Sequence, residues 1–182
     1  MGATTTTTLL TFEEFEHLPD APGKRELLEG ELLELPPPKR RHTIIQHRIA
    51  EALRRYAIER GLLVFIEAGF RLGTRRGEWL QPDVSVVSLE QEERAAIDPD
   101  GYYQGSPLIA VEVISPANTA ETVERKLAKY FENGASEVWV AFPKTRRIWR
   151  HQELKAQAVI ERDVFTSPLL PGFEMDLGAI FQ

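Results

Sequence analysis

Apolar residues recur with two different spacings along the chain, and the spacing separates predicted helices from predicted strands. The clearest helix follows Lys39-Arg40-Arg41 and stops near Gly61, because its apolar residues fall at three- and four-residue steps: Ile45, Ile49, Ala52, Leu53 and Tyr56. A second helix is predicted after Asn118. Shorter helices are predicted at residues 12–17, at 90–97 and after Asp176.

The predicted strands differ in how apolar they are. Residues 109–114 form a nearly continuous apolar run, which is typical of a central strand covered on both faces. Residues 64–72 alternate between apolar and more polar positions, which predicts a strand with one more polar face. Further strands are predicted at 84–87, 137–142, 148–151 and 158–161, and a hairpin turning at Glu29-Gly30 is predicted within 26–35. Because helices and strands interleave, the predicted fold class is α/β with a mixed central β-sheet flanked by helices.

Length and composition place the chain among globular proteins. Its 182 residues suit one domain, predicted at 11–182 behind a flexible lead at 1–10 that holds a threonine run. No apolar run reaches the ~18 residues of a membrane span, and the N-terminus does not resemble a secretory signal. The chain has no cysteine, which excludes thiolate chemistry and favours a cytoplasmic location. Its net charge of −6 argues against a general nucleic-acid coat protein but not against a local basic patch.

One acid, Glu112, lies inside the apolar run of residues 109–114. Strand alternation puts it on the same face as Ala110 and Ile114. A buried carboxylate without a partner is strongly disfavoured, so we expect Glu112 to be paired, protonated or metal-bound. From this pattern alone, a salt bridge within the core and a functional role are supported about equally.

A second acid, Asp83, follows Pro82 at the start of the predicted strand 84–87. Taken alone, Asp83 would be interpreted as a turn-forming residue. If strands 84–87 and 109–114 are neighbours, however, Asp83 and Glu112 can converge near one point at the edge of the sheet. Two carboxylates, a backbone carbonyl such as that of Val113, and waters suit Mg²⁺ or Mn²⁺, which prefer oxygen ligands.

Lys126 lies at the margin of the apolar stripe of the helix after Asn118. At ~100° per residue, it is about 60° from Val123 and about 40° from Tyr130. The commonest role of such a lysine is to cover apolar surface with its stem while its ammonium reaches water. The functional alternative is a cation that orients or deprotonates an attacking water, or that stabilises developing phosphate charge.

Basic residues cluster in Lys39-Arg40-Arg41, and His42 follows them at the start of a predicted helix. We interpret the three basic residues and His42 as candidates for nucleic-acid contact, with His42 as a cap or surface residue that can also lie in a cleft. The tract 146–151 mixes basic and aromatic residues and could contact phosphates, although a solvated hairpin is the simpler explanation. Zinc chemistry is disfavoured, because His42 and His47 would lie ~140° apart on a helix.

These residues together resemble the PD-(D/E)XK superfamily of nucleases, which have the restriction endonuclease-like fold. The resemblance rests on Pro82-Asp83, on Glu112-Val113 at the end of a buried strand, and on Lys126, since a lysine moved to the following helix is a known variation. More narrowly, the chain is similar to a large bacterial family of restriction-type endonucleases, formerly described as a domain of unknown function. The matching segments cover nearly the full length: 26–31, His42, 81–84, 111–116, Lys126 with Tyr130, Gly134 with Trp139, and 170–172.

The resemblance implies a sheet of about four or five strands, Mg²⁺-dependent hydrolysis of phosphodiester bonds in DNA, and a homodimer. It carries Asp83 and Glu112 over as metal ligands and Lys126 as the catalytic lysine. An additional acid from the N-terminal region usually completes such a site. Glu26 matches that position best, and Glu31 is the alternative.

Two other classes of function stay open at this point. Thr122 and Phe142 stand where the family commonly has acids, which favours a DNA-binding or regulatory module that keeps the fold without catalysis. Such a module would bind DNA with salt-dependent affinity and show no turnover. A structural domain, in which Asp83, Glu112 and Lys126 form only a buried ion network, would bind no metal and would lose stability when one partner is removed.

Overall fold

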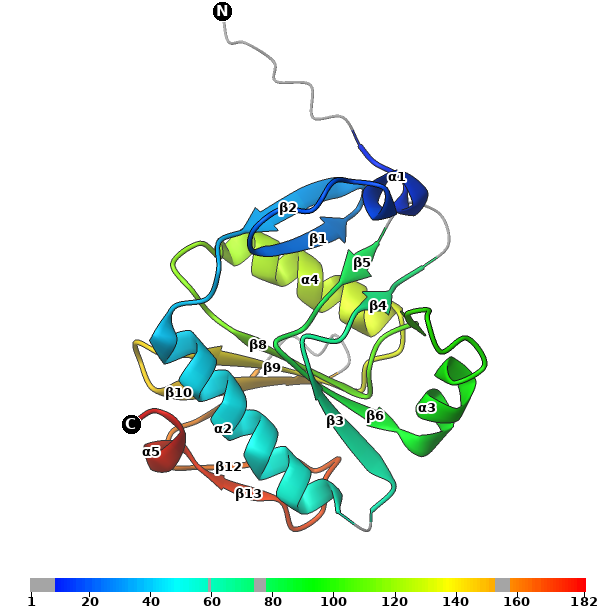
Figure 1. Cartoon of the computed structure of the whole chain (residues 1–182). Helices are drawn as coiled ribbons and strands as arrows, with labels where there is room; N and C mark the ends of the chain where they lie inside the picture. The colour runs from blue at the N-terminus through cyan, green and yellow to red at the C-terminus, as the bar shows by residue number, and fades with distance from the viewer. Residues whose placement is uncertain (1–8, 59, 74–77, 153–157) are drawn as a thin grey trace, which may run out of the picture.

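The computed structural model describes residues 9–58, 60–73, 78–152 and 158–182, and a six-stranded sheet forms the middle layer of this part of the chain (Figure 1). The strand order is β11-β10-β9-β8-β6-β3. β8 and β9 are parallel, and the other neighbouring pairs are antiparallel. The strands are β3 Leu62–Ile66, β6 Val84–Ser88, β8 Ile109–Val113, β9 Glu137–Phe142, β10 Arg147–Gln152 and β11 Val159–Glu161. The predicted α/β class with a mixed sheet is therefore confirmed.

Two long helices cover opposite faces of this sheet (Figure 1). Helix α2 (Arg40–Ala57) buries its apolar stripe against one face, and the C-terminal elements complete the core on that side. Helix α4 (Ala120–Glu132) lies over the other face, where Tyr130 belongs to a separate buried cluster. The C-terminal elements are β12 Val164–Thr166, β13 Glu174–Asp176 and α5 Leu177–Ile180. The sheet is thus buried on both faces, as the apolar run 109–114 predicts.

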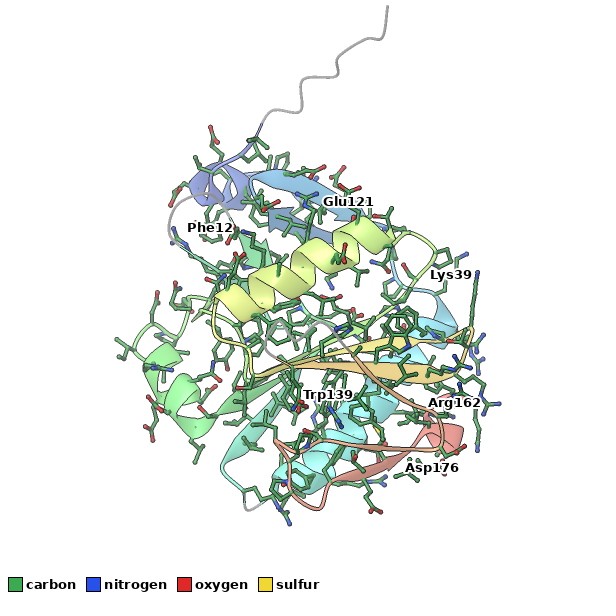
Figure 2. All side chains as sticks on the ribbon, turned by 180° about the vertical axis from the view of Figure 1, so that it is seen from behind. Phe12, Lys39, Glu121, Trp139, Arg162 and Asp176 are labelled. Atoms are coloured by element: carbon green, nitrogen blue, oxygen red, sulfur yellow. The ribbon has the colours of Figure 1, made fainter. Side chains whose placement is uncertain are left out.

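A second, smaller sheet lies on the far side of α4, so that this helix is enclosed between the β1–β2 hairpin and the six-stranded sheet (Figures 1 and 2). Its order is β2-β1-β5-β4-β7. The strands are β1 Lys24–Leu28, β2 Glu31–Leu35, β4 Phe70–Arg71, β5 Trp79–Leu80 and β7 Tyr103–Gln104, and the short helices α1 Phe12–Glu16 and α3 Leu89–Ala95 flank them. The predicted hairpin turn is found, with Glu29 and Gly30 both at positive φ. This sheet therefore places β1 beside α4.

The predicted single strand over residues 64–72 is wrong. The chain leaves β3 after Ile66, Glu67 adopts a left-handed φ of 53°, and β4 begins only at Phe70 in the other sheet. Gly69 lies against the ring of Trp79, and a Cβ at Gly69 would approach that ring to 2.5 Å. Alternation of apolar residues continues across the break because both pieces are half-buried strands, so the pattern alone did not reveal it.

Smaller differences concern the count and length of strands. The six strands of the main sheet exceed the four or five that the resemblance implied. Residues 98–107, whose Gly, Pro and Asp content predicts a loop, contain the short strand β7. The sequence Arg75-Arg76-Gly77 predicts a turn, but these residues lie outside the described ones, as do residues 1–8 of the predicted lead. Leu10, at the end of that lead, donates its N–H to the Gly30 carbonyl at 2.7 Å. None of the described helices is both long and apolar enough to cross a membrane.

Candidate active site

Antiparallel pairing of β6 with β8 brings Asp83 and Glu112 together. Val84 lies opposite Val111 in this pair, and both side chains belong to the core on the α2 side. Side chains alternate along a strand, so Asp83 and Glu112, each one residue further, face α4 instead. The Val113 N–H donates to Asp83 Oδ2 at 2.7 Å. The convergence that the sequence predicts for neighbouring strands is therefore found.

Lys126 connects two acids inside the protein. Its side chain is 3% exposed, and its Nζ lies 2.6 Å from Glu26 Oε2 and 3.0 Å from Glu112 Oε1. Tyr130, one turn further along α4, donates its hydroxyl to the same Glu112 oxygen at 2.7 Å. The Lys126 ammonium therefore ends among carboxylates. The surface-covering interpretation is not met, because it would place the ammonium in water.

Glu26, and not Glu31, is the N-terminal acid that reaches this cluster. Glu26 is fully buried on β1, where its Oε1 also accepts the Gln81 N–H at 3.0 Å. Glu31 instead forms an ion pair with Arg125 at 2.8 Å, and its side chain is 39% exposed. Position in the fold thus separates the two alternatives that the sequence left open.

Two further side chains approach Asp83 from other elements. Lys24 Nζ lies 3.4 Å from Asp83 Oδ1 and 3.5 Å from Glu26 Oε1. His42, in the first turn of α2, places its Nε2 3.3 Å from the same Asp83 oxygen. His42 is therefore half-buried in the acid cluster, and the prediction of a cap or surface position is wrong, because the N-cap of α2 is Lys39.

Asp83 and Glu26 are held in their charged forms. Burial raises the pKa of Asp83, but the Lys24 ammonium and the His42 ring outweigh burial and keep that pKa well below its usual range. Burial also opposes ionisation of Glu26, yet Lys24 and Lys126 together lower its pKa. Both acids are consequently ionised at neutral pH.

Glu112 has the opposite electrostatic balance. Burial raises its pKa, and the neighbouring charges of Glu26 and Asp83 raise it further, while Lys126 and Lys24 offset only part of this effect. Burial lowers the pKa of Lys126, but Glu112 and Glu26 raise it more, so Lys126 stays protonated. Acids whose environments push their pKa values apart are typical of sites that divide acid and base roles.

The basic residues predicted to contact nucleic acid lie beside this cluster. Lys39 caps α2, Arg40 and Arg41 are exposed in its first turn, and Arg41 donates to the Pro143 carbonyl in the β9–β10 turn. Figure 2 shows Lys39 next to the tip of that hairpin. We call the following exposed residues the basic rim: Lys39, Arg40, Arg41, Lys144 and Arg146. Because His42 follows Arg41 directly, the basic rim borders the acid cluster.

The donor atoms suit a hard divalent cation. Asp83 and Glu112 offer carboxylate oxygens, and β8 ends beside them at Val113, whose carbonyl is a third oxygen donor. Over the described ranges, no three His, Cys, Asp or Glu side chains are arranged so as to enclose a metal ion. Mg²⁺ is commonly held by one or two carboxylates together with waters and substrate phosphates, rather than by a cage of protein ligands. The cluster therefore fits the magnesium type of site, and not a closed structural one.

Sequence reasoning gave no role to Lys24 or Gln46. Gln46 donates its Nε2 to Glu67 Oε1 and to the Asp83 carbonyl, both at 3.0 Å. The sequence spacing of each residue from a predicted site residue could have indicated its position. Lys24 precedes Glu26 by two residues, which puts both on one face of a strand, and Gln46 follows His42 by four residues, which puts both on one face of a helix.

This arrangement of sheet, helices and acid cluster defines the chain as a protein of the restriction endonuclease-like fold. A crystal structure from Anabaena variabilis ATCC 29413, described as "a putative nuclease belonging to DUF820", matches it with a TM-score of 0.80 at 18% sequence identity. The match covers 94% of this chain and 97% of that one, and at such identity it shows the fold alone. Residues 12–178 match the family described as Uma2, "Putative restriction endonuclease", so the chain belongs to this family. No curated protein matches the chain significantly.

Proposed function

We propose that this chain is a metal-dependent endonuclease that hydrolyses phosphodiester bonds in DNA. The observation that carries the proposal is the gathering of Glu26, Asp83 and Glu112 from three separate segments, with the buried ammonium of Lys126 between Glu26 and Glu112. Buried charges destabilise a fold unless they are paired, so such a cluster on one edge of a sheet is typical of a functional site. Membership of a family of nucleases supports the same class of reaction.

Asp83, Glu112 and the Val113 carbonyl would hold Mg²⁺ or Mn²⁺. When bound, such an ion polarises a phosphoryl oxygen and lowers the pKa of a bound water. Asp83 is already ionised through its basic neighbours, and Tyr130 fixes the Glu112 carboxylate by its hydroxyl hydrogen bond. The chain thus presents oriented oxygens without further rearrangement of these two side chains.

Lys126 is proposed as the catalytic lysine. Its ammonium donates toward Glu112, and Glu26 keeps it charged and in place from the other side. From this position it would orient the attacking water or offset the charge that develops on the phosphate. Glu26 acts through Lys126 and is therefore a positioning residue.

The basic rim is the surface that we propose for the DNA backbone. Lys39, Arg40 and Arg41 are exposed and border the acid cluster through His42, and no acidic side chain of the described residues forms an ion pair with them. Phosphate contacts of this kind position the duplex without reading its sequence. The proposal also includes a homodimer, expected from the family resemblance, and a cytoplasmic location, expected from the absence of cysteine.

The test is cleavage of duplex and single-stranded DNA with Mg²⁺ or Mn²⁺ by wild type and by Glu112→Gln. We expect Glu112→Gln to lower the cleavage rate at least about 100-fold, the scale at which loss of one electrostatic partner acts in other enzymes. Glu90→Gln is the matched control, because Glu90 is an exposed acid of α3 that pairs with Arg94, outside the cluster. Equal cleavage by wild type, Glu112→Gln and Lys126→Met would overturn the assignment.

A DNA-binding module without turnover is the second candidate. It is favoured by two departures from the family pattern, because Thr122 and Phe142 stand where the family commonly has acids. In the structure, Thr122 hydrogen-bonds Thr119 at the start of α4, and Phe142 packs against Trp149. Neither residue supplies an acid to the cluster. Salt-dependent DNA binding by wild type, with no cleavage in either metal, would identify this candidate.

A further inference from the structure

Lys24 is a second lysine of the acid cluster, partly buried, and the proposed reaction gives it no role. It lies two residues before Glu26 on β1, so both side chains point from the same face of the strand toward α4. Its Nζ lies 3.4 Å from Asp83 Oδ1 and 3.5 Å from Glu26 Oε1. Lys24 therefore contacts one of the acids proposed as a metal ligand.

Both carboxylate oxygens of Asp83 already have partners. The Val113 N–H occupies Oδ2 at 2.7 Å, and Oδ1 has His42 Nε2 at 3.3 Å and Lys24 Nζ at 3.4 Å. A magnesium ion needs its oxygen ligands at about 2.0–2.1 Å. An ion bound to Oδ1 at that distance would lie within a few Å of the Lys24 ammonium, where two positive charges repel strongly.

The charge balance of the cluster leads to the same conclusion. When Glu26, Asp83 and Glu112 are ionised, their three negative charges and the ammonium groups of Lys24 and Lys126 leave one net negative charge. A divalent cation added to this set would leave one net positive charge in a buried place. If Lys24 moves out, the same cation cancels the remaining charge, and a buried uncompensated charge is avoided.

Lys24 makes longer ion pairs than Lys126 and lies beside a pocket. Its two ion-pair distances, 3.4 and 3.5 Å, exceed the 2.6 and 3.0 Å of Lys126 and the usual ~2.7–2.9 Å of a charge-assisted hydrogen bond. Its side chain is 13% exposed. A pocket of about 270 Å³ opens beside it, lined also by Arg25, Gln81 and Trp79. The ammonium can therefore turn into this pocket without unfolding β1.

We propose that Lys24 is an internal competitor for the divalent metal: its ammonium holds Asp83 in the metal-free protein and leaves when the metal binds. This inference rests on the proposed function, because it takes Asp83 and Glu112 as the metal ligands. Lys24 thereby weakens metal affinity and sets the metal concentration at which the site fills. Lys126 does not hold Asp83, since its ion pairs within the described chain are with Glu26 and Glu112.

The test is calorimetric titration of Mn²⁺ into the metal-free full chain, as wild type, Lys24→Met and Lys24→Gln. We expect both variants to bind Mn²⁺ at least about tenfold more tightly than wild type, because removal of a like charge a few Å away favours the cation. Lys129→Met is the matched control, since Lys129 also pairs with three acids, Glu29, Glu78 and Glu132, outside the cluster. It should bind as wild type does. Adding Asp83→Ala to Lys24→Met should abolish the gain.

The outcomes separate this inference from the proposed function. Equal affinity of wild type and both Lys24 variants, or weaker binding by the variants, would make Lys24 a structural counter-ion and leave the proposed metal site standing. No binding by any of them at millimolar Mn²⁺ would overturn both. Two variants are used because methionine at this position removes a partner of Glu26, whereas glutamine keeps a hydrogen-bond donor. A thermal melt of each variant verifies that it is folded.

Discussion

At the scale of single residues, Lys126 has the strongest effect on the acid cluster. It is the ammonium group that contacts both Glu26 and Glu112, and it lies almost wholly inside the protein. Breaking a buried ion pair by removing one partner is far more costly than the pair is worth, because the other charge stays buried without compensation. The identity of this one side chain therefore affects stability and proposed chemistry together.

We predict that Lys126→Met lowers the free energy of unfolding by about 3–5 kcal/mol at pH 8, the usual cost of an uncompensated buried charge. The loss should be smaller at pH 5. In the variant, the already raised pKa of Glu112 rises further and the pKa of Glu26 loses the lowering effect of Lys126. Where these folded-state pKa values lie above the unfolded value of about 4.3, the folded state takes up protons and regains stability as the pH falls through them. Urea unfolding at the two pH values measures this difference.

Lys129→Met provides the comparison for that experiment. The acids that Lys129 contacts are partly exposed, so its removal should cost no more than about 1 kcal/mol at either pH. A loss for Lys126→Met that is the same at pH 5 and pH 8 would contradict the assignment of Lys126 as the buried partner of two carboxylates.

At the scale of elements, the break between β3 and β4 is what places the second sheet. β3 pairs with β6 in the main sheet, and β4 pairs with β5 and β7 in the smaller one. The break also positions Glu67, whose backbone N–H donates to the Asp83 carbonyl at 3.3 Å. The same few residues thus connect the two sheets and support the segment that carries Asp83.

We predict that Gly69→Ala destabilises the protein by about 1–3 kcal/mol, the usual cost of an added methyl group in a filled space. The added Cβ would meet the Trp79 ring at 2.5 Å. Thermal unfolding of a double-mutant cycle with Trp79→Phe measures the effect, because Trp79 Nε1 has no hydrogen-bond partner among the described residues and the smaller ring gives space without breaking a bond. An equal cost of Gly69→Ala in both backgrounds would show that backbone conformation, and not the ring, requires glycine.

At the scale of the whole molecule, the distribution of charge matters more than its sum. The chain carries a net charge of −6, yet the basic rim gathers positive side chains from the start of α2 and from the β9–β10 turn. These segments are about 100 residues apart in sequence and are joined by the contact of Arg41 with Pro143. A local positive surface beside buried acids suits a polyanion whose phosphate must approach the acid cluster.

We predict that the triple change Lys39→Gln, Arg40→Gln and Arg41→Gln weakens DNA binding and lowers the slope of log affinity against log salt by up to about 2.7, at about 0.9 for each phosphate that is no longer neutralised. The measurement uses the Glu112→Gln background without metal, so that binding is read without cleavage. Arg55→Gln with Arg94→Gln is the control, because both arginines are exposed and pair with acids elsewhere. A slope unchanged by the triple substitution would place the DNA on another surface.

The sequence by itself determined the elements whose signal is local. The apolar spacing of α2 and α4, the continuous run of β8 and the turn at Glu29-Gly30 all follow from the preferences of residues near each other in the chain, and the structure confirms them. The alternation of side chains along β6 and β8 also placed Asp83 and Glu112 on one face, once the two strands were assumed to pair. The functional roles of these residues stay predictions until the variants are measured.

The tertiary structure alone decided which charged side chains meet. Lys126 sits at the margin of its helical stripe, and only the position of β1 turns it toward Glu26 instead of water. Likewise, the choice of Glu26 over Glu31, and the approach of Lys24 and His42 to Asp83, depend on segments that are distant in sequence. The two-residue strands β4, β5 and β7 exist only through their partners. Local patterns contain no information about such partners, because the energy of an ion pair or a strand pair depends on both members being in place.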